Sequence, residues 1–423
     1  MRNDNHPPTG AAPAADATAP APVVLTVGRR PPAADYDVAL LDLDGVVYTG
    51  QGAVPGAVAA LASARAAGLR LAFVTNNASR SPSAIAAHLA RLGIPATAAD
   101  VVTSAQAAAR LIAQRVPAGS RVLVAGGMGL RLALREHGLH PVSTAAERPA
   151  AVVQGYAPDI SYGLLAEAAV AVRDGALFVA SNADATLPTP RGPQPGNGAL
   201  LQVVITATGT WPVVAGKPEP PLHAEAVART QARRPLVVGD RLDTDIEGAV
   251  RAGADSMLVL TGVCTPEDAV LAPAAQRPTY ISADLDGLLE PQPVVGLGGS
   301  ERASRACPDG TTPRGQVRDG PGTGGPGTGG PSCAGPGTGG PGTGAWHSGV
   351  APQPGAVSPG VLSYGGWEAR LIGSEPLELT GEGAWIDGLR ALCAAAWSAG
   401  KATAGQIAPA LEKLRELGMP GPG

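Results

Sequence analysis

Short apolar runs alternate with longer mixed segments along the chain, from about residue 35 to residue 289. Polar and apolar side chains do not alternate within a run, which is typical of strands buried on both faces of a parallel sheet. The pattern predicts strands over Val38–Leu43 and Leu69–Val74, and helices over Pro55–Ala67 and Ser83–Leu92. This succession predicts an α/β fold built on a Rossmann-like, doubly wound parallel sheet.

A second series of strands and helices begins after residue 117, and it is long enough to form a module of its own. We therefore expect an inserted α/β domain at residues 118–211, flanked by the two parts of the first module at 35–117 and 212–290. A long irregular segment, Ser181–Gly198, lies near its end. Loops of this length in compact domains are usually functional or disordered. The expected elements of the insert are strands at Arg121–Ala125, Ala151–Gly155 and Leu177–Ala180 and a helix at Leu164–Arg173.

Glycine and proline, with 58 and 42 residues, concentrate in two regions that lack apolar periodicity. These regions predict a disordered leader over residues 1–34 and a disordered Gly/Pro-rich linker over 291–360. The final segment, 361–423, regains apolar residues and contains Trp367, Trp385 and Trp397. We expect a small C-terminal α+β unit there, with one or two strands and two helices.

The formal net charge of −4 gives no broad attraction for nucleic acid or for an anionic membrane. A small phosphorylated metabolite is therefore the expected partner, with no nucleic acid and no membrane. The cysteines are far apart in the sequence, which favours a reducing, cytoplasmic compartment. The oligomeric state stays open, with a homodimer through the inserted domain as one arrangement.

Two aspartates, Asp42 and Asp44, follow the first apolar run directly. In an open α/β sheet, ligands bind outside the carboxyl ends of the strands, and the predicted first strand places both carboxylates there. Two unit charges about 4 Å apart repel by roughly 4 kcal/mol at an effective dielectric constant near 20, so the pair needs a proton or a cation. Mg²⁺ suits such oxygen ligands. The alternative is that both are ordinary loop aspartates, one of which caps the next helix.

Polar residues also follow three later strands. Thr75, Asn76 and Asn77 offer neutral donors for phosphate oxygens, or alternatively a helix N-cap. Lys217 stands at a strand-to-helix junction, where it either neutralises Asp42 and a phosphate or is simply solvated. The acidic cluster around Asp240 and Asp245 indicates a cation site, although Asp243 or Thr244 could instead serve as a helix cap.

Four motifs together resemble those of the haloacid dehalogenase superfamily: DLDG at 42–45, VTNN at 74–77, GKP at 216–218 and GDRLDTD at 239–245. They occur in the superfamily's order, each after an apolar strand. The inserted domain resembles the large α/β (C2-type) cap of subfamily IIA, which includes 4-nitrophenyl phosphatases, pyridoxal phosphate phosphatases and NagD-like nucleotidases.

The resemblance implies a Mg²⁺-dependent phosphatase that works through an aspartyl-phosphate. Asp42 would be the nucleophile and Asp44 the general acid and base. Mg²⁺ would be held by Asp42, the backbone carbonyl of Asp44 and Asp240, with Asp245 in support. The phosphoryl oxygens would be bound by Thr75, Asn76, Asn77 and Lys217.

The cap segment Ser181–Gly198 would face the aspartates and select the leaving group, through Asn182, Asp184 and Arg191. It contains no aromatic residue on which a base or pyridine ring could stack, and small polar side chains suit a polyol. The C-terminal segment also resembles that of actinobacterial glycerol-3-phosphate phosphatases, where it looks like an incomplete acetyltransferase fold. Glycerol 3-phosphate is therefore the favoured substrate, with pyridoxal phosphate or a nucleoside monophosphate as alternatives.

A hypothesis of another class is a scaffold protein that binds through the C-terminal unit. The intact set of motifs favours the enzyme. Because all four motifs and the cap precede the linker, we also expect a chain that ends near Glu290 to fold and to keep its activity.

Overall fold

The structure is a computed structural model. It describes residues 26–27, 30–187, 189, 191–295, 361–371, 373–400 and 402–421. Most of the expected leader and nearly all of the expected linker therefore lie outside the described residues. Among the residues described, no helix is both long enough and apolar enough to cross a membrane.

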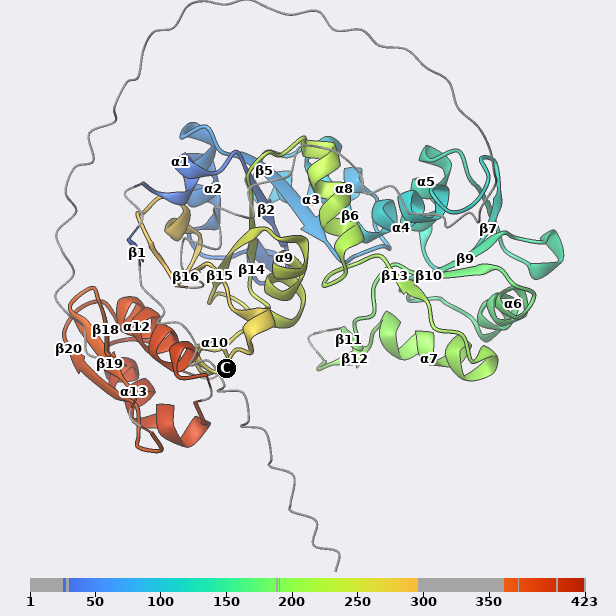
Figure 1. Ribbon diagram of the computed structural model, residues 1–423. Coiled ribbons are helices and arrows are strands. Elements are labelled where there is room, and N and C mark those ends of the chain that lie inside the picture. The colour runs from blue at the N-terminus through green and yellow to red at the C-terminus, as the bar shows by residue number, and fades with distance from the viewer. Residues whose placement is uncertain are drawn as a thin grey trace, which may run out of the picture. The chain divides into compact units, whose positions relative to one another are not determined.

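The sheet of the first module, here called the core sheet, has six strands in the order β16-β15-β14-β2-β5-β6, and all neighbouring pairs are parallel (Figure 1). The central strand β2 is buried along its whole length, as the apolar run predicts. Ala39 and Leu41 face one hydrophobic cluster, whereas Val38 and Leu40 face another. The strands are β2 Val38–Leu41, β5 Arg70–Thr75, β6 Val101–Thr103, β14 Pro235–Gly239, β15 Asp255–Val259 and β16 Tyr280–Ser282.

Helices cover both faces of this sheet, which confirms the doubly wound arrangement. Residues of α2 and α3 join the cluster on one face, and residues of α4, α8 and α9 join the cluster on the other. The helices are α2 Ala57–Ala66, α3 Pro82–Arg91, α4 Ser104–Ala113, α8 Pro220–Thr230 and α9 Glu247–Ala252, with α10 Pro266–Val270 near the end of the core. A short π-helical turn, Leu242–Ile246, leads into α9.

The cap is built on a five-stranded parallel sheet in the order β13-β10-β9-β7-β8. Its last strand, β13, pairs with β10, so the cap sheet extends beyond the expected boundary at residue 211. A two-stranded hairpin, β11 Thr186–Leu187 and β12 Gln194–Pro195, forms within the segment expected to be irregular. The remaining cap elements are β7 Arg121–Ala125, α5 Met128–Glu136, β8 His140–Val142, β9 Ala151–Gln154, α6 Tyr162–Arg173, β10 Leu177–Ala180, α7 Asn197–Thr208 and β13 Val213–Val214.

Helix α7 and strand β8 are absent from the sequence prediction. The α7 sequence contains several β-branched residues, which disfavour helix formation in isolation. Packing decides the outcome, because Leu201, Val204 and Ile205 are buried in one cluster with apolar residues of α6 and the cap sheet.

Among its described residues, the C-terminal unit contains three antiparallel strands and two helices, where one or two strands and two helices were expected. Its bounds are β18 Val361–Tyr364, β19 Trp367–Arg370, β20 Glu378–Gly381, α12 Trp385–Ser398 and α13 Ala404–Glu416. Its buried residues form one hydrophobic cluster with core residues that include Val270 and Ile281. The unit is therefore packed on the core, which argues against the expectation that it is dispensable.

The ordered core also begins earlier and ends later than the sequence predicts. Strand β1, Thr26–Val27, pairs antiparallel with β17, Pro293–Val294, and helix α1 spans Pro32–Asp35. Val295 is fully buried. Two-residue strands held by distant partners leave no periodic signal in the sequence, which explains the shift of both boundaries from residues 35 and 290.

Candidate active site

The acidic residues meet where neighbouring strands of the core sheet end. Strands β14, β2 and β5 are adjacent (Figure 1), and the sequence places Asp240, Asp42 and Thr75 at or directly after their carboxyl ends. Lys217 comes from the segment that returns from the cap sheet to α8. The site is thus assembled from residues far apart in the chain.

The ammonium group of Lys217 is the central cation of the site. It is 4% exposed, and it donates to Asp42 Oδ1, to Asp245 Oδ1 at 2.6 Å and to the carbonyl of Val74 at 3.2 Å. Burial by itself would lower the pKa of Lys217, but the carboxylates of Asp245 and Asp42 raise it above its ordinary value. Lys217 therefore stays charged, and it is not the solvated loop lysine of the alternative interpretation.

Three carboxylates lie around this cation. Asp42, Asp240 and Asp245 each place one oxygen within 4.8 Å of the others. Asp240 Oδ2 accepts from the amide of Val263 at 2.7 Å, whereas its buried Oδ1 has no hydrogen-bond partner among the described residues. Burial, with Asp245 nearby, raises the pKa of Asp240 to about 6. One lysine cannot neutralise three clustered carboxylates, two of them buried, so the open Oδ1 fits a hard divalent cation.

Asp245 has a different set of contacts. Its Oδ1 accepts from Lys217, and its Oδ2 accepts from the amide of Arg241 at 3.2 Å. Since both oxygens have donors, its geometry suits a supporting role that fixes Lys217. The resemblance implies support of the Mg²⁺ site by Asp245, and that role stays a prediction.

Gly45 makes the close turn of the DLDG motif possible. Its φ of +85° lies in the left-handed region, which favours glycine. A Cβ at this position would lie 2.4 Å from Asp240 Oδ2, so a side chain would collide with the carboxylate. The glycine thus lets the first motif approach the fourth.

Asp44 stands apart from the three-carboxylate cluster and is exposed on one side. Burial by the surrounding protein raises the pKa of its carboxyl, and the positive charges of Arg80 and Lys217 oppose that shift. A carboxyl with a raised pKa near a nucleophile is suited to proton transfer.

Thr75, Asn76 and Asn77 are not equally available for the expected phosphate contacts. The Thr75 hydroxyl is buried and accepts from the amide of Asn77 at 3.1 Å, which leaves its own proton available to donate. Asn77 Oδ1 accepts from the amides of Ser79 and Arg80, so its side chain shapes the loop. This geometry does not support the expected phosphate contact from the Asn77 side chain.

Asn76 joins the core, the cap and the segment that carries Lys217. Its Oδ1 accepts from the Lys217 amide at 2.7 Å, and its Nδ2 donates to the Lys217 carbonyl at 3.1 Å. The same Nδ2 lies 3.3 Å from Asp184 Oδ2. With both ends of its amide engaged, the side chain of Asn76 positions Lys217, and its contacts do not support the expected role in phosphate binding.

The cap residues expected to select the substrate are separated by the structure. Asn182 is buried and donates to the carbonyl of Asn76 at 2.8 Å, and burial raises the pKa of the neighbouring Asp184. The Arg191 side chain is exposed, and its backbone amide contacts Thr189. Asn182 and Asp184 thus reach the core, while no described contact brings Arg191 to it.

Two arginines near the site were missed as candidates. Arg80 is a cation near Asp44, as its effect on that carboxyl shows. Arg241 pairs with Asp243 through bonds of 3.0 and 2.7 Å, and these contacts raise its pKa above the ordinary value. In the sequence, only their positions could have pointed to these arginines, because each lies in or within a few residues of one of the four motifs.

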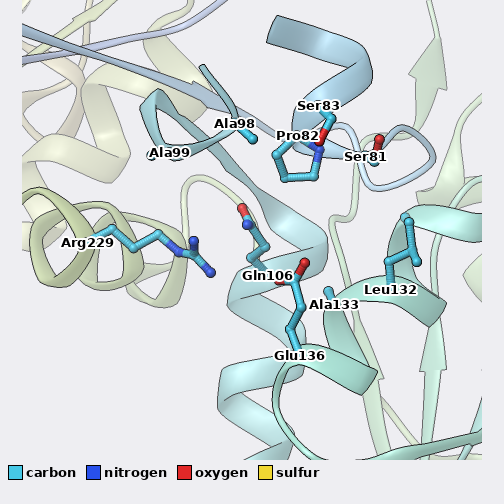
Figure 2. A pocket seen from close by; sticks show the side chains of 11 residues that line it. Ser81, Pro82, Ser83, Ala98, Ala99, Gln106, Leu132, Ala133, Glu136 and Arg229 are labelled. Atoms are coloured by element: carbon cyan, nitrogen blue, oxygen red, sulfur yellow. The ribbon is translucent and has the colours of Figure 1, made fainter. Parts of the chain in front are cut away.

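A cavity of about 410 Å³ lies between α3, α4, α5 and α8 (Figure 2). Ser81, Gln106, Glu136 and Arg229 are among the residues that line it. Arg229 already pairs with Glu225 at 2.5 Å, and none of the three clustered aspartates lines the cavity. We assign this cavity no part in the chemistry.

His223, on α8, gives the native state a pH dependence. Burial, with the positive charge of Lys217, lowers its pKa to about 3, so the imidazole is neutral in the folded protein. Its contribution to stability is complete above its unfolded pKa of about 6.5 and is lost as the pH falls toward 3. We expect the free energy of unfolding to contain a loss of about 2–3 kcal/mol from this group between pH 7 and pH 4.

Urea unfolding at several pH values checks this expectation. His223→Leu should flatten the acid side of the stability profile relative to wild type, and His140→Leu, at an exposed histidine of the cap, should leave its shape unchanged. A His223→Leu profile parallel to that of wild type would contradict the assignment.

The fold and site define a class of α/β hydrolase in which a buried lysine and clustered carboxylates lie at the carboxyl edge of a parallel sheet. Residues 39–140 match the family model described as haloacid dehalogenase-like hydrolase, and residues 214–288 match a second model of HAD-hydrolase type. Residues 364–419 match a GCN5-related N-acetyltransferase like domain.

Sequence similarity to curated proteins supports the same family. The chain is 53% identical over 256 residues to D-glycerol 3-phosphate phosphatase of Mycobacterium tuberculosis, which covers 60% of this chain and 72% of the relative. It is 38% identical to acid sugar phosphatase of Staphylococcus saprophyticus, over 60% of this chain and 98% of the relative. The chain belongs to the haloacid dehalogenase-like hydrolase family and is a phosphatase.

Solved structures extend the similarity beyond the catalytic core. The crystal structure of glycerol phosphate phosphatase from Mycobacterium tuberculosis in complex with magnesium has a TM-score of 0.69 and 39% identity, covering 91% of this chain and 99% of that chain. The same enzyme in complex with calcium has a TM-score of 0.70. These findings favour the enzyme over the scaffold hypothesis.

Proposed function

We propose that this enzyme is a Mg²⁺-dependent glycerol 3-phosphate phosphatase. The observation that carries the proposal is the cluster of Asp42 and the buried Lys217 and Asp240 at the end of the core sheet. The relative of 53% identity, whose name specifies D-glycerol 3-phosphate, supports the choice of substrate.

The first half of the reaction transfers the phosphoryl group to Asp42. One carboxylate oxygen of Asp42 attacks phosphorus while the bond from phosphorus to the ester oxygen breaks. The carboxyl of Asp44 gives its proton to the departing oxygen, which yields glycerol and an aspartyl-phosphate. A carboxyl whose pKa is raised by burial keeps such a proton more readily than an ordinary aspartate does.

The second half returns the enzyme to its starting state. Asp44, now ionised, takes a proton from a water molecule whose oxygen attacks phosphorus. The bond from phosphorus to Asp42 breaks, and inorganic phosphate leaves. Throughout, Lys217 and the Thr75 hydroxyl donate to phosphoryl oxygens. The side chain of Asn76 keeps Lys217 in place by bonding with the backbone amide and carbonyl of Lys217.

The open Oδ1 of Asp240, together with Asp42 and the backbone carbonyl of Asp44, would hold Mg²⁺. The bound ion supplies positive charge to the phosphoryl oxygens and fixes their orientation relative to Asp42. Asp245 supports the site by fixing Lys217.

The cap loop supports a small polyol as leaving group. Segment Ser181–Gly198 is rich in small polar side chains and has no aromatic residue on which a base or pyridine ring could stack. We accordingly rank glycerol 3-phosphate above pyridoxal phosphate and nucleoside monophosphates. The proposal places the enzyme in the cytoplasm, without nucleic acid or membrane partners, and keeps a homodimer through the cap as one arrangement.

A panel of phosphorylated metabolites tests the substrate. Phosphate release at fixed Mg²⁺ should give glycerol 3-phosphate the highest kcat/KM, or one close to it. A tenfold preference for pyridoxal phosphate or a nucleotide corresponds to about 1.4 kcal/mol of transition-state discrimination. Such a preference would reject glycerol 3-phosphate and leave the phosphatase activity standing.

A further inference from the structure

The C-terminal unit holds the catalytic core through a buried polar contact at one helix end. The indole Nε1 of Trp397, on α12, donates to the carbonyls of Ala269 and Val270 at 3.2 and 3.1 Å. These are the last two residues of α10. The final carbonyls of a helix have no partner inside it, so the indole caps α10 from outside.

A cation strengthens the same contact. Arg277 donates from Nη1 to the carbonyl of Trp397 at 3.2 Å, and its guanidinium carbon lies 5.6 Å from the indole ring centroid. Trp397 is 3% exposed. A buried indole that is paired on both its ring and its N–H has little freedom to move, so α10 is held firmly against the C-terminal unit.

The other end of α10 continues from the loop that surrounds Asp240. The amide of Val263 donates to Asp240 Oδ2 at 2.7 Å, and the amide of Cys264 donates to the Asp240 carbonyl at 3.0 Å. Gly262 lies so close that a Cβ there would stand 2.0 Å from Oδ2. Thr265 then caps the first turn of α10. The donors to Asp240 therefore lie directly before the capping residue of α10 in the chain.

We propose that the C-terminal unit orients the metal ligand Asp240, with Trp397 as a positioning residue that acts through α10. This inference rests on the proposed Mg²⁺ site. The Val263 amide fixes Oδ2 and thereby aims the unpartnered Oδ1 at the cation. If α10 shifted, that amide would move, and Asp240 would bind Mg²⁺ less tightly even though no ligand had changed.

The test compares two buried tryptophans of the same unit in the full-length protein. Trp397→Phe keeps an aromatic ring but removes the donor to α10. Trp367→Phe is the matched control, because Trp367 is 0% exposed and its Nε1 donates to Ala384 at 3.1 Å, inside the C-terminal unit. Calorimetric titration of metal-free protein with Mg²⁺ gives the dissociation constant directly. The Mg²⁺ dependence of 4-nitrophenyl phosphate hydrolysis gives a second measure.

Trp397→Phe should raise the Mg²⁺ dissociation constant by about three- to tenfold, below the usual effect of removing a direct partner of a ligand. At saturating Mg²⁺ its kcat should return to near the wild-type value. Trp367→Phe should lower the melting temperature without changing Mg²⁺ affinity. Should Trp397→Phe not fold, Arg277→Met removes the neighbouring donor and should shift Mg²⁺ affinity in the same direction.

Two results would overturn the inference, and they are distinguishable. Equal Mg²⁺ affinity in wild type and in the folded variant at Trp397, or at Arg277 in its place, would mean that the unit adheres to the core without orienting Asp240. Wild-type protein that neither binds Mg²⁺ nor releases phosphate would instead overturn the proposed function, and the inference with it.

Discussion

Asp42→Asn should lower phosphatase activity by at least about 10⁴-fold, because an amide oxygen cannot form the aspartyl-phosphate. Asp42 lies at the end of β2, and its Oδ1 accepts from the buried ammonium of Lys217. The substitution preserves the shape of the side chain and removes its charge. Initial rates of phosphate release from an aryl phosphate and from glycerol 3-phosphate give the measurement, and a labelled phosphoenzyme trapped in acid should be absent from the variant.

Two companion variants make this result interpretable. Asp44→Asn should also lose most activity but should bind Mg²⁺ nearly as well as wild type, since its carboxyl lies outside the three-carboxylate cluster. Asp37→Asn, before the opposite end of the same strand, should keep activity within about twofold. Substantial turnover by purified Asp42→Asn protein would refute its assignment as the nucleophile.

The alternation of apolar runs and helices was enough to predict the core sheet, because strands buried on both faces leave an unbroken apolar signal. Val38–Leu41 shows this directly, since its residues face two different hydrophobic clusters. Short edge elements have no comparable signal. Strand β13 could be assigned to the cap only from its pairing with β10, and α7 required the packing of its apolar face.

The site was predicted better for charged residues than for amides. Asp42, Asp240 and Lys217 converge as expected, because a buried cation and buried carboxylates need one another. Asn76 and Asn77 have side chains suited to phosphate binding, yet a side-chain amide can equally well form hydrogen bonds that connect backbone segments. Only the geometry shows that Asn76 bonds with both the amide and the carbonyl of Lys217.

The sequence pattern could not predict which residues of the core the C-terminal unit contacts. The apolar stripe of α12 predicted burial, and the structure supplies the partners. Trp397 meets Val270, and Arg390, 7% exposed, donates to the carbonyl of Ile281 at 2.8 Å. These partners are more than 100 residues apart in the chain, with the linker between them. A chain ending near Glu290 would expose this apolar surface, so we expect it to be less soluble than the full-length protein.

Lys217→Met should lower both activity and stability, because in the proposed mechanism the ammonium donates to the phosphoryl group, and in the structure it offsets the carboxylates of Asp42 and Asp245. Loss of this donor should lower kcat/KM by about 10²–10³-fold, as for other donors to a developing negative charge. In EDTA, Asp42 and Asp245 would lose their buried cation, and breaking a buried ion pair typically costs about 3–5 kcal/mol. Urea unfolding with EDTA and with Mg²⁺ measures the second effect.

Magnesium should restore part of that lost stability but little of the activity, since the ion supplies charge at Asp42 and Asp240 and cannot replace the donor that Lys217 directs at the phosphate. Lys413→Met is the matched control: its ammonium donates to the Leu379 carbonyl at 3.1 Å within the C-terminal unit, so removing it should leave kcat/KM unchanged. A Lys217→Met enzyme with near wild-type kcat/KM would show that the phosphoryl oxygens are bound elsewhere. Unchanged stability in EDTA would mean that Asp42 or Asp245 takes up a proton at little cost once the ammonium is gone.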